Sequence, residues 1–250
     1  MSANPMPLEQ TQPVARLSPG ARVTGVLFNP QATFADIVAA PTWIAPLVLL
    51  TLLSLISVVC LNQRMDWRQF ASQQLDKSSR AADLSAEQKE KQIDAIAKFA
   101  PISAYVFGVP AVAVVIVLSA ALLLAAYNLL AGANVRFVTA MAIVSHAFLA
   151  SLVSTGIFLL VIFLKPRGTI DIENPVATNL GVLVAEDAPK WLMKLALSID
   201  IFSFWILILI AIGFAAANPR KLTFGKSLGI ALGMWALFVV LRVGAAWIFS

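Results

Sequence analysis

Three side chains that can carry acid–base or ionic chemistry lie inside long apolar stretches of this sequence: His146, Asp200 and Arg242. Ionised groups are costly in a lipid bilayer, so they normally face the interior of a helix bundle and pair there. Asp200 lies near the start of one apolar stretch and Arg242 near the end of the next. A short loop joins these two stretches, so they should run antiparallel, with both charges at similar depth. The spacing predicts an ion pair or a shared polar network near one membrane face.

His146 and Asn128 are expected nearer the opposite face, where a hydrogen bond between neighbouring helices would satisfy them. A metal site needs several grouped ligands, and the chain has one His and one Cys. The sequence also contains no phosphate-binding glycine loop and no nucleophile elbow. We therefore expect no metal site, no cofactor and no catalytic residue, and predict that the protein is not an enzyme.

Five apolar stretches must position these side chains. A helix needs about 20 apolar residues to cross a hydrocarbon core of roughly 30 Å, and inside lipid the backbone can bond only to itself. Hydrophobic residues make up 60% of the chain and charged residues 12%, against about 25% charged residues in soluble domains. The sequence predicts an all-α fold, a polytopic membrane helical bundle with five transmembrane helices. The predicted spans are 43–61, 102–131, 138–164, 195–217 and 228–249.

The first loop, residues 62–100, is the largest segment between spans, and its acidic and basic residues nearly balance. Ser85 followed by Gln88 is a capping-box signature for the start of a helix. Ile93 and Ile96 then share one helical face. The pattern predicts a helical hairpin that continues both flanking spans out of the membrane, with a turn near residues 78–83.

The segment before the first span divides into two parts. Residues 1–22 are largely polar at the start, rich in proline and without a long apolar stretch, so we predict a disordered tail. Residues 23–250 form the predicted membrane domain. Within it, Phe34, Ile37 and Val38 recur at helical spacing, which predicts a short helix capped by Thr33 and lying on the membrane surface.

Gly225, Gly229 and Gly233 repeat every four residues at the start of the last span. Small residues at this spacing form a smooth stripe that another helix can approach closely. The stripe predicts a close helix contact, either within the chain or between two copies in a homo-oligomer.

The net charge of +5 is spread over several loops without a basic block, so nothing indicates binding to nucleic acid. The short loops 132–137 and 218–227 carry basic residues and no acidic residue. These acid-free loops favour a cytoplasmic N-terminus. A strict count of basic residues over all loops favours the opposite orientation, because acidic residues contribute little to the positive-inside rule.

Several stretches together are typical of a known family. They are the entry at Phe28-Asn29-Pro30 with Phe34 and Trp43, the segments 174–181 and 200–205, and Ile212-Gly213. The chain resembles the Yip family, the Ypt/Rab-interacting membrane proteins, in its bacterial branch. It departs from the family pattern at Gly132-Ala133, where a glycine pair is common, and at residues 145–150, which lack a proline.

The resemblance implies five membrane helices, a cytoplasmic N-terminus and, for a bacterial relative, the inner membrane. Eukaryotic relatives interact with Rab-type GTPases, but the short N-terminal tail here offers little surface for a GTPase. We expect a non-enzymatic scaffold or membrane-organising protein whose partners are the bilayer and an unidentified protein. The alternative is a small transporter or permease-like protein with a polar site near Asp200, Arg242 and His146. A water-filled cavity joining these residues would favour the transporter, and a tightly packed bundle the scaffold.

Overall fold

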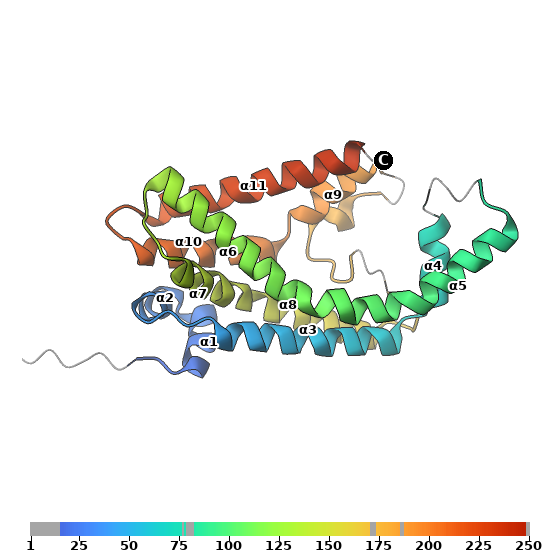
Figure 1. The fold of residues 1–250 in the computed structure, drawn as a ribbon, viewed down its shortest axis with the longest axis horizontal. Coiled ribbons are helices and arrows are strands. Elements are labelled where there is room, and N and C mark those ends of the chain that lie inside the picture. The colour runs from blue at the N-terminus through green and yellow to red at the C-terminus, as the bar shows by residue number, and fades with distance from the viewer. Residues whose placement is uncertain (1–15, 77, 79–82, 171–173, 186–187, 249–250) are drawn as a thin grey trace, which may run out of the picture.

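The computed structural model describes residues 16–76, 78, 83–170, 174–185 and 188–248. These residues form helices and connecting segments, with one isolated antiparallel bridge between Asn179 and Asp200. The bundle is elongated, with the N-terminal helices at one end and a helical hairpin at the other (Figure 1). The predicted all-α polytopic bundle is therefore confirmed.

Four helical stretches are long and apolar enough to cross a membrane. Two of them are continuous runs of several labelled helices, as Figure 1 shows. The four stretches are α3 (Ile44–Arg64), the run α5 (Ala86–Ser103), η2 (Ala104–Gly108) and α6 (Val109–Ala131), the run α7 (Phe137–Ala147), η3 (Phe148–Ala150) and α8 (Ser151–Leu164), and α11 (Phe224–Ile248).

The fourth predicted span, 195–217, is broken in the structure. Its apolar part is α10 (Ile201–Ala217), which has 17 residues, and its first residues belong to the separate helix α9 (Lys190–Ser198). The break occurs because Asp200 has an extended backbone, and its carboxylate accepts a hydrogen bond from the backbone N–H of Ser203 at 2.9 Å. A side-chain acceptor of this kind starts a new helix rather than continuing the previous one.

The core of the bundle lies between α2 (Pro30–Ala39), α6, α7, α10 and α11. Phe34 and Ile37 of α2 are fully buried there, so protein rather than lipid covers the apolar face that we assigned to the membrane surface. Thr33 is not the cap either, because it lies inside α2 and its hydroxyl donates to the carbonyl of Asn29. Asn29 stands at the cap position, and Pro30 begins the helix, where its missing N–H costs nothing.

The folded region starts before residue 23. Residues 1–15 of the predicted tail lie outside the described part of the chain, but α1 (Pro19–Phe28) already begins at Pro19. Arg22 on α1 is buried, and its Nε donates to Asp36 Oδ2 at 2.7 Å. Its Nη1 also donates to the carbonyl of Ala40 at 2.9 Å and to Thr42 Oγ1 at 2.8 Å. This cluster fastens α1 to α2 and to the approach to the first span.

The first loop forms the predicted helical hairpin from α4 (Trp67–Asp76) and α5. Ser85 and Gln88 make the predicted capping box, so the expected helix start is confirmed. Arg68 on α4 pairs with Glu90 and Asp94 on α5, and these contacts, led by the hydrogen bond to Asp94, raise the pKa of Arg68. Of the predicted turn, residues 79–82 lie outside the described residues.

Candidate functional site

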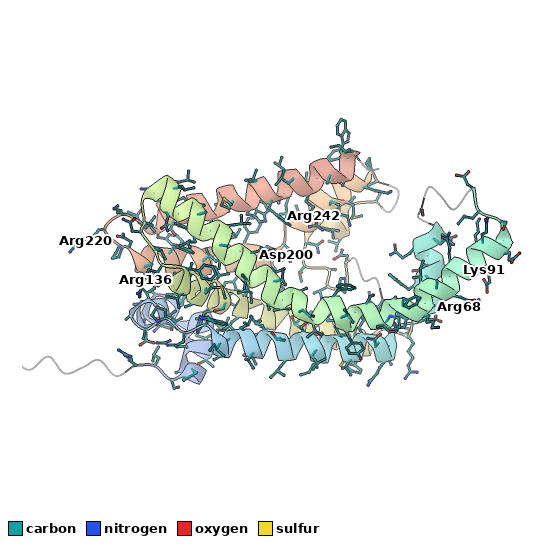
Figure 2. All side chains as sticks on the ribbon, in the orientation of Figure 1. Arg68, Lys91, Arg136, Asp200, Arg220 and Arg242 are labelled. Atoms are coloured by element: carbon teal, nitrogen blue, oxygen red, sulfur yellow. The ribbon has the colours of Figure 1, made fainter. Side chains whose placement is uncertain are left out.

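A hollow of about 460 Å³ opens among α3, α6, α8, α11 and the segment that leads into α10. Its charged lining residues, Asp200 and Arg242, lie away from the end of the bundle that carries Arg136 and Arg220 (Figure 2). The polar lining residues are Ser54, Ser57, Ser151, Ser154, Thr155, Asn174, Thr178, Asn179, Asp200 and Arg242.

Asp200 holds the entry of α10 against the segment 174–179. Its Oδ1 accepts a hydrogen bond from the Thr178 hydroxyl at 2.8 Å, and its Oδ2 accepts from the Ser203 hydroxyl at 3.1 Å as well as from the Ser203 N–H. The backbone N–H of Leu180 donates to the carbonyl of Ile199 at 3.1 Å. Non-helical backbone at membrane depth is tolerated only where such groups are satisfied by protein or line a cavity, and both conditions hold here.

Arg242 reaches the same hollow from α11. Its Nη1 donates to Ser198 Oγ at 3.1 Å, and the Ser198 hydroxyl in turn donates to the carbonyl of Lys194 at 2.7 Å. Over the part of the chain that the structure describes, no ion pair within 4.0 Å joins Arg242 to Asp200. The prediction was an ion pair or a shared polar network. The structure brings the two charges to one hollow, but among the described residues each has its own polar partners, Thr178 and Ser203 for Asp200 and Ser198 for Arg242.

His146 does not belong to this site. The side chain is buried in α7, is not among the residues that line the hollow, and its Nδ1 lies 2.8 Å from the carbonyl of Ala142. Because a carbonyl can only accept, Nδ1 is the nitrogen that carries the proton. The predicted bond to a neighbouring helix is wrong for His146, since the carbonyl four residues earlier in its own helix is within reach.

Asn128 has a structural role at the end of the bundle that carries the loops 132–137 and 218–227, here called the short-loop end. Its Nδ2 donates to the carbonyl of Val135 at 3.0 Å, and its Oδ1 accepts from the Val135 N–H at 2.9 Å. The side chain thus closes the loop that follows α6, where Gly132 adopts a left-handed conformation with φ of 56°. The predicted partner was a neighbouring helix, but the observed partner is the connecting loop.

The glycine stripe of α11 makes no close contact with the described part of the chain. A Cβ atom built on Gly225, Gly229 or Gly233 would meet no heavy atom within 4 Å among the described residues. The buried side of α11 instead carries Ser227 and Ala231, a second pair of small residues four apart. The prediction of an internal contact is wrong because the helix has two small-residue stripes, and the bundle packs against the other one.

Two buried polar clusters were missed by the sequence analysis. One is the Arg22–Asp36 ion pair, whose only sequence signal is an arginine and an aspartate on either side of the Asn29-Pro30 break. The other joins α6 to α11, where the Tyr127 hydroxyl donates to the carbonyl of Ser227 at 2.7 Å. The ring of Tyr127 also stacks on Phe214, with centroids 3.9 Å apart. Sequence spacing gave no signal for this second cluster.

The hollow supplies groups for binding. It offers one carboxylate, one guanidinium and several hydroxyls, and its lining holds no histidine or cysteine beside a hydroxyl. The Asp200 carboxylate does accept from the Thr178 hydroxyl, and the same carboxylate caps the start of α10. No group of three or more His, Cys, Asp or Glu residues in the described ranges is placed to hold a metal ion.

Comparison with known protein families matches residues 24–245 to the Yip1 domain. The match covers most of the 250-residue chain, including α2, all the spanning helices and the segments that line the hollow. No curated protein and no solved structure gives a significant match.

Proposed function

Because this chain belongs to the Yip1 domain family and is an integral, multi-pass membrane protein, we propose that it is a non-enzymatic scaffold that organises the membrane or binds another protein. The N-terminus and the short loops then face the cytoplasm, and the membrane is the bacterial inner membrane. The partners are the bilayer and a membrane or cytoplasmic protein.

The observation that carries the scaffold proposal is the construction of the short-loop end. The loop after α6 and the loop after α10 are fastened to each other, because Asn218 Nδ2 donates to the carbonyl of Ala133 at 2.8 Å. Lys221 Nζ also donates to the carbonyl of Gly132 at 2.6 Å. Together with the two hydrogen bonds between Asn128 and the backbone of Val135, these bonds fix the shape of both loops. A surface that is fixed before binding loses less conformational entropy when a partner docks.

The same end presents exposed positive charge. Arg136 and Arg220 are exposed, and neither has an ion-pair partner among the described residues. Basic residues next to a membrane attract anionic headgroups and acidic protein surfaces. This rigid, basic short-loop face supports a role in binding rather than in chemistry.

Site-specific photo-crosslinking in living cells tests the proposal. A crosslinking residue at position 220 should capture one defined protein, whereas the same residue at position 91, on the exposed hairpin at the other end, should not. Replacement of Arg136 by Glu should reduce the capture at position 220. Equal capture at both positions, or capture that ignores the Arg136→Glu change, would argue against a scaffold that works through this face.

A second copy of the chain is also a candidate partner, since the stripe at Gly225, Gly229 and Gly233 is exposed and no described residue lies within 4 Å of a Cβ built on it. Oxidative cross-linking of a Gly229→Cys variant in a Cys60→Ser background tests this. A disulfide-linked dimer at low protein density in the membrane is the expected result. An exposed cysteine on another face of α11 should not form this dimer. No dimer from Gly229→Cys, or an equal amount from the control cysteine, would exclude the stripe as a dimer contact.

A permease-like function is the second candidate, favoured by one observation, the hollow that Asp200 and Arg242 both line. His146 lies outside the hollow, so only part of the suggested polar site is assembled. A transporter must open its site to both sides of the membrane. Labelling of a Thr155→Cys variant by an impermeant reagent from both sides would support transport, and labelling from one side only would count against it.

A further inference from the structure

Two opposite charges line one hollow without neutralising each other. Among the described residues, Asp200 receives hydrogen bonds from neutral groups alone, Thr178 and Ser203, and Arg242 donates to the neutral Ser198 hydroxyl. Burial of an ionised group is costly unless an opposite charge compensates it. A single ligand that carries both a negative and a positive group would compensate both residues at once.

The Arg242 side of the hollow has spare hydrogen-bond donors. A guanidinium carries five N–H donors, and within the described ranges Nη1 alone of Arg242 has an acceptor, the Ser198 hydroxyl. The fork of N–H groups on an arginine matches the oxygens of a phosphate, which it can hold through two parallel bonds. This side of the hollow is suited to a phosphate group.

The rest of the lining of the hollow is rich in hydrogen-bond acceptors. The hydroxyls of Ser57, Ser151 and Ser154 donate to helix carbonyls at 2.9, 2.7 and 3.0 Å, so the groups they have left to offer are oxygen lone pairs. The Asp200 carboxylate only accepts as well. Acceptors of this kind suit a primary ammonium group, which has three N–H donors. A trimethylammonium group has no such donor and is normally recognised by an aromatic cage.

The two charges of the hollow lie at the ends of α10 and α11 that are far from the short loops. The 17 residues of α10 place Asp200 about 25 Å from the short-loop end, at about 1.5 Å per residue. Arg242 lies about 27 Å along α11 from Phe224 by the same rise per residue. A hydrocarbon core about 30 Å thick that begins at the short loops would end near both charges, where phospholipid headgroups begin. The lining serines of α3 lie deeper, because Ser54 and Ser57 are about 15 and 20 Å along that helix from Ile44.

We propose that this hollow binds the headgroup of a phospholipid that carries a primary ammonium group. The phosphate lies at Arg242, and the ammonium lies at Asp200 and the hydroxyls of α3 and α8. A volume of about 460 Å³ holds a headgroup, while the acyl chains stay outside in the bilayer. The apolar lining residues Val112, Phe158 and Phe202 accompany the start of those chains. This site goes beyond the proposed scaffold function, which depends on the other end of the bundle.

The test measures lipid binding to the purified full-length protein in detergent. Phosphatidylethanolamine, phosphatidylcholine and phosphatidylglycerol are added separately, and bound lipid is counted by native mass spectrometry. We expect phosphatidylethanolamine to bind at least about tenfold more tightly than the other two lipids. A difference of this size corresponds to one charge-assisted hydrogen bond. Asp200→Asn should remove that preference, and Arg242→Gln should weaken binding of all three lipids.

The controls separate loss of the site from loss of the fold. Asp200→Asn keeps an oxygen that can cap α10, and Ser154→Ala removes one acceptor while leaving every charge in place. Ser154→Ala should reduce the preference for phosphatidylethanolamine by several-fold, and Lys91→Gln, on the exposed hairpin away from the hollow, should leave it unchanged. Thermal unfolding of each variant shows whether the bundle remains intact.

Two results would overturn the proposal. The first is equal binding of the three lipids, or an unchanged preference in Asp200→Asn. The second is binding of soluble phosphoethanolamine as tight as that of the lipid, which would make a soluble zwitterion the ligand. Retention of the preference when Asp200→Asn is combined with Ser154→Ala would place the lipid elsewhere on the protein and overturn the assignment too.

Discussion

Gly213 of α10 lies so close to Ile143 of α7 that a Cβ atom on the glycine would overlap Cγ2 of the isoleucine. The same Cβ would lie 3.0 Å from Cδ1 of Phe34, which comes from α2. Three helices therefore meet at one glycine. A close helix approach in the described bundle therefore lies here and not at the glycine stripe on α11.

Gly213→Ala should lower the stability of the bundle. The added methyl group must displace Ile143 or Phe34, and overpacking of a dense core typically costs about 1–3 kcal/mol. Gly229→Ala is the matched control, because nothing lies within 4 Å of its Cβ and alanine favours the helix by up to about 1 kcal/mol. Thermal unfolding in detergent should rank Gly213→Ala below the unaltered protein, with Gly229→Ala at or above it. Equal effects of the two changes would contradict the contact.

Arg22→Ala should destabilise the N-terminal helices strongly. It removes three described hydrogen-bond partners and leaves the half-buried Asp36 carboxylate without its countercharge. The expected loss is about 3–5 kcal/mol, the usual cost of breaking a buried pair from one side. Arg68→Ala is the control, since that pair is exposed and such pairs contribute about 0–1 kcal/mol. Denaturant unfolding should separate the two variants, and similar losses would count against the buried cluster.

Asp200→Ala should loosen the start of α10, whereas Asp200→Asn should not. The alanine loses the acceptor for the Ser203 N–H, which typically costs about 0.5–2 kcal/mol, and asparagine keeps an equivalent oxygen. Hydrogen exchange at the first residues of α10 gives the local measure. Faster exchange there in Asp200→Ala alone is the expected result. The same exchange rate in both variants would show that the cap does not hold the helix start.

Ser85→Ala should fray the first turn of α5. The change removes half of the capping box, at a typical cost of about 1 kcal/mol. Amide exchange in residues 86–89 should speed up, while the rest of α5 up to Lys98 stays protected. A hairpin that exchanged quickly along its whole length in the unaltered protein would contradict a folded α5.

Single-cysteine labelling should place the two ends of the bundle on opposite sides of the membrane. In a Cys60→Ser background, an impermeant reagent added outside should label Asp83→Cys, which lies in the exposed hairpin loop. Arg220→Cys, at the short-loop end, should react only after the membrane is opened. Labelling of position 220 alone from outside would reverse the proposed orientation.

The sequence by itself determined the elements whose signals are local. Apolar length fixed the four long spans and most of the fifth, because a backbone in lipid must close its own hydrogen bonds. The Ser85–Gln88 capping box and the apolar face at Ile93 fixed the hairpin, since both depend on residues a few positions apart. The family resemblance came from stretches along the same chain and was confirmed by the Yip1 domain match.

Only the tertiary structure decided which side of each helix faces the other helices of the bundle. Asp200 and Arg242 line one hollow, as their similar positions along antiparallel helices predicted. Each side chain, however, bonds to a hydroxyl near its own helix, Thr178 for Asp200 and Ser198 for Arg242. The sequence showed two small-residue stripes on α11 without showing which one the bundle would cover. Spacing along a helix gives the height of a side chain and its angle relative to its neighbours. The direction of the whole helix face is set by packing against helices that are distant in the sequence, which no local pattern records.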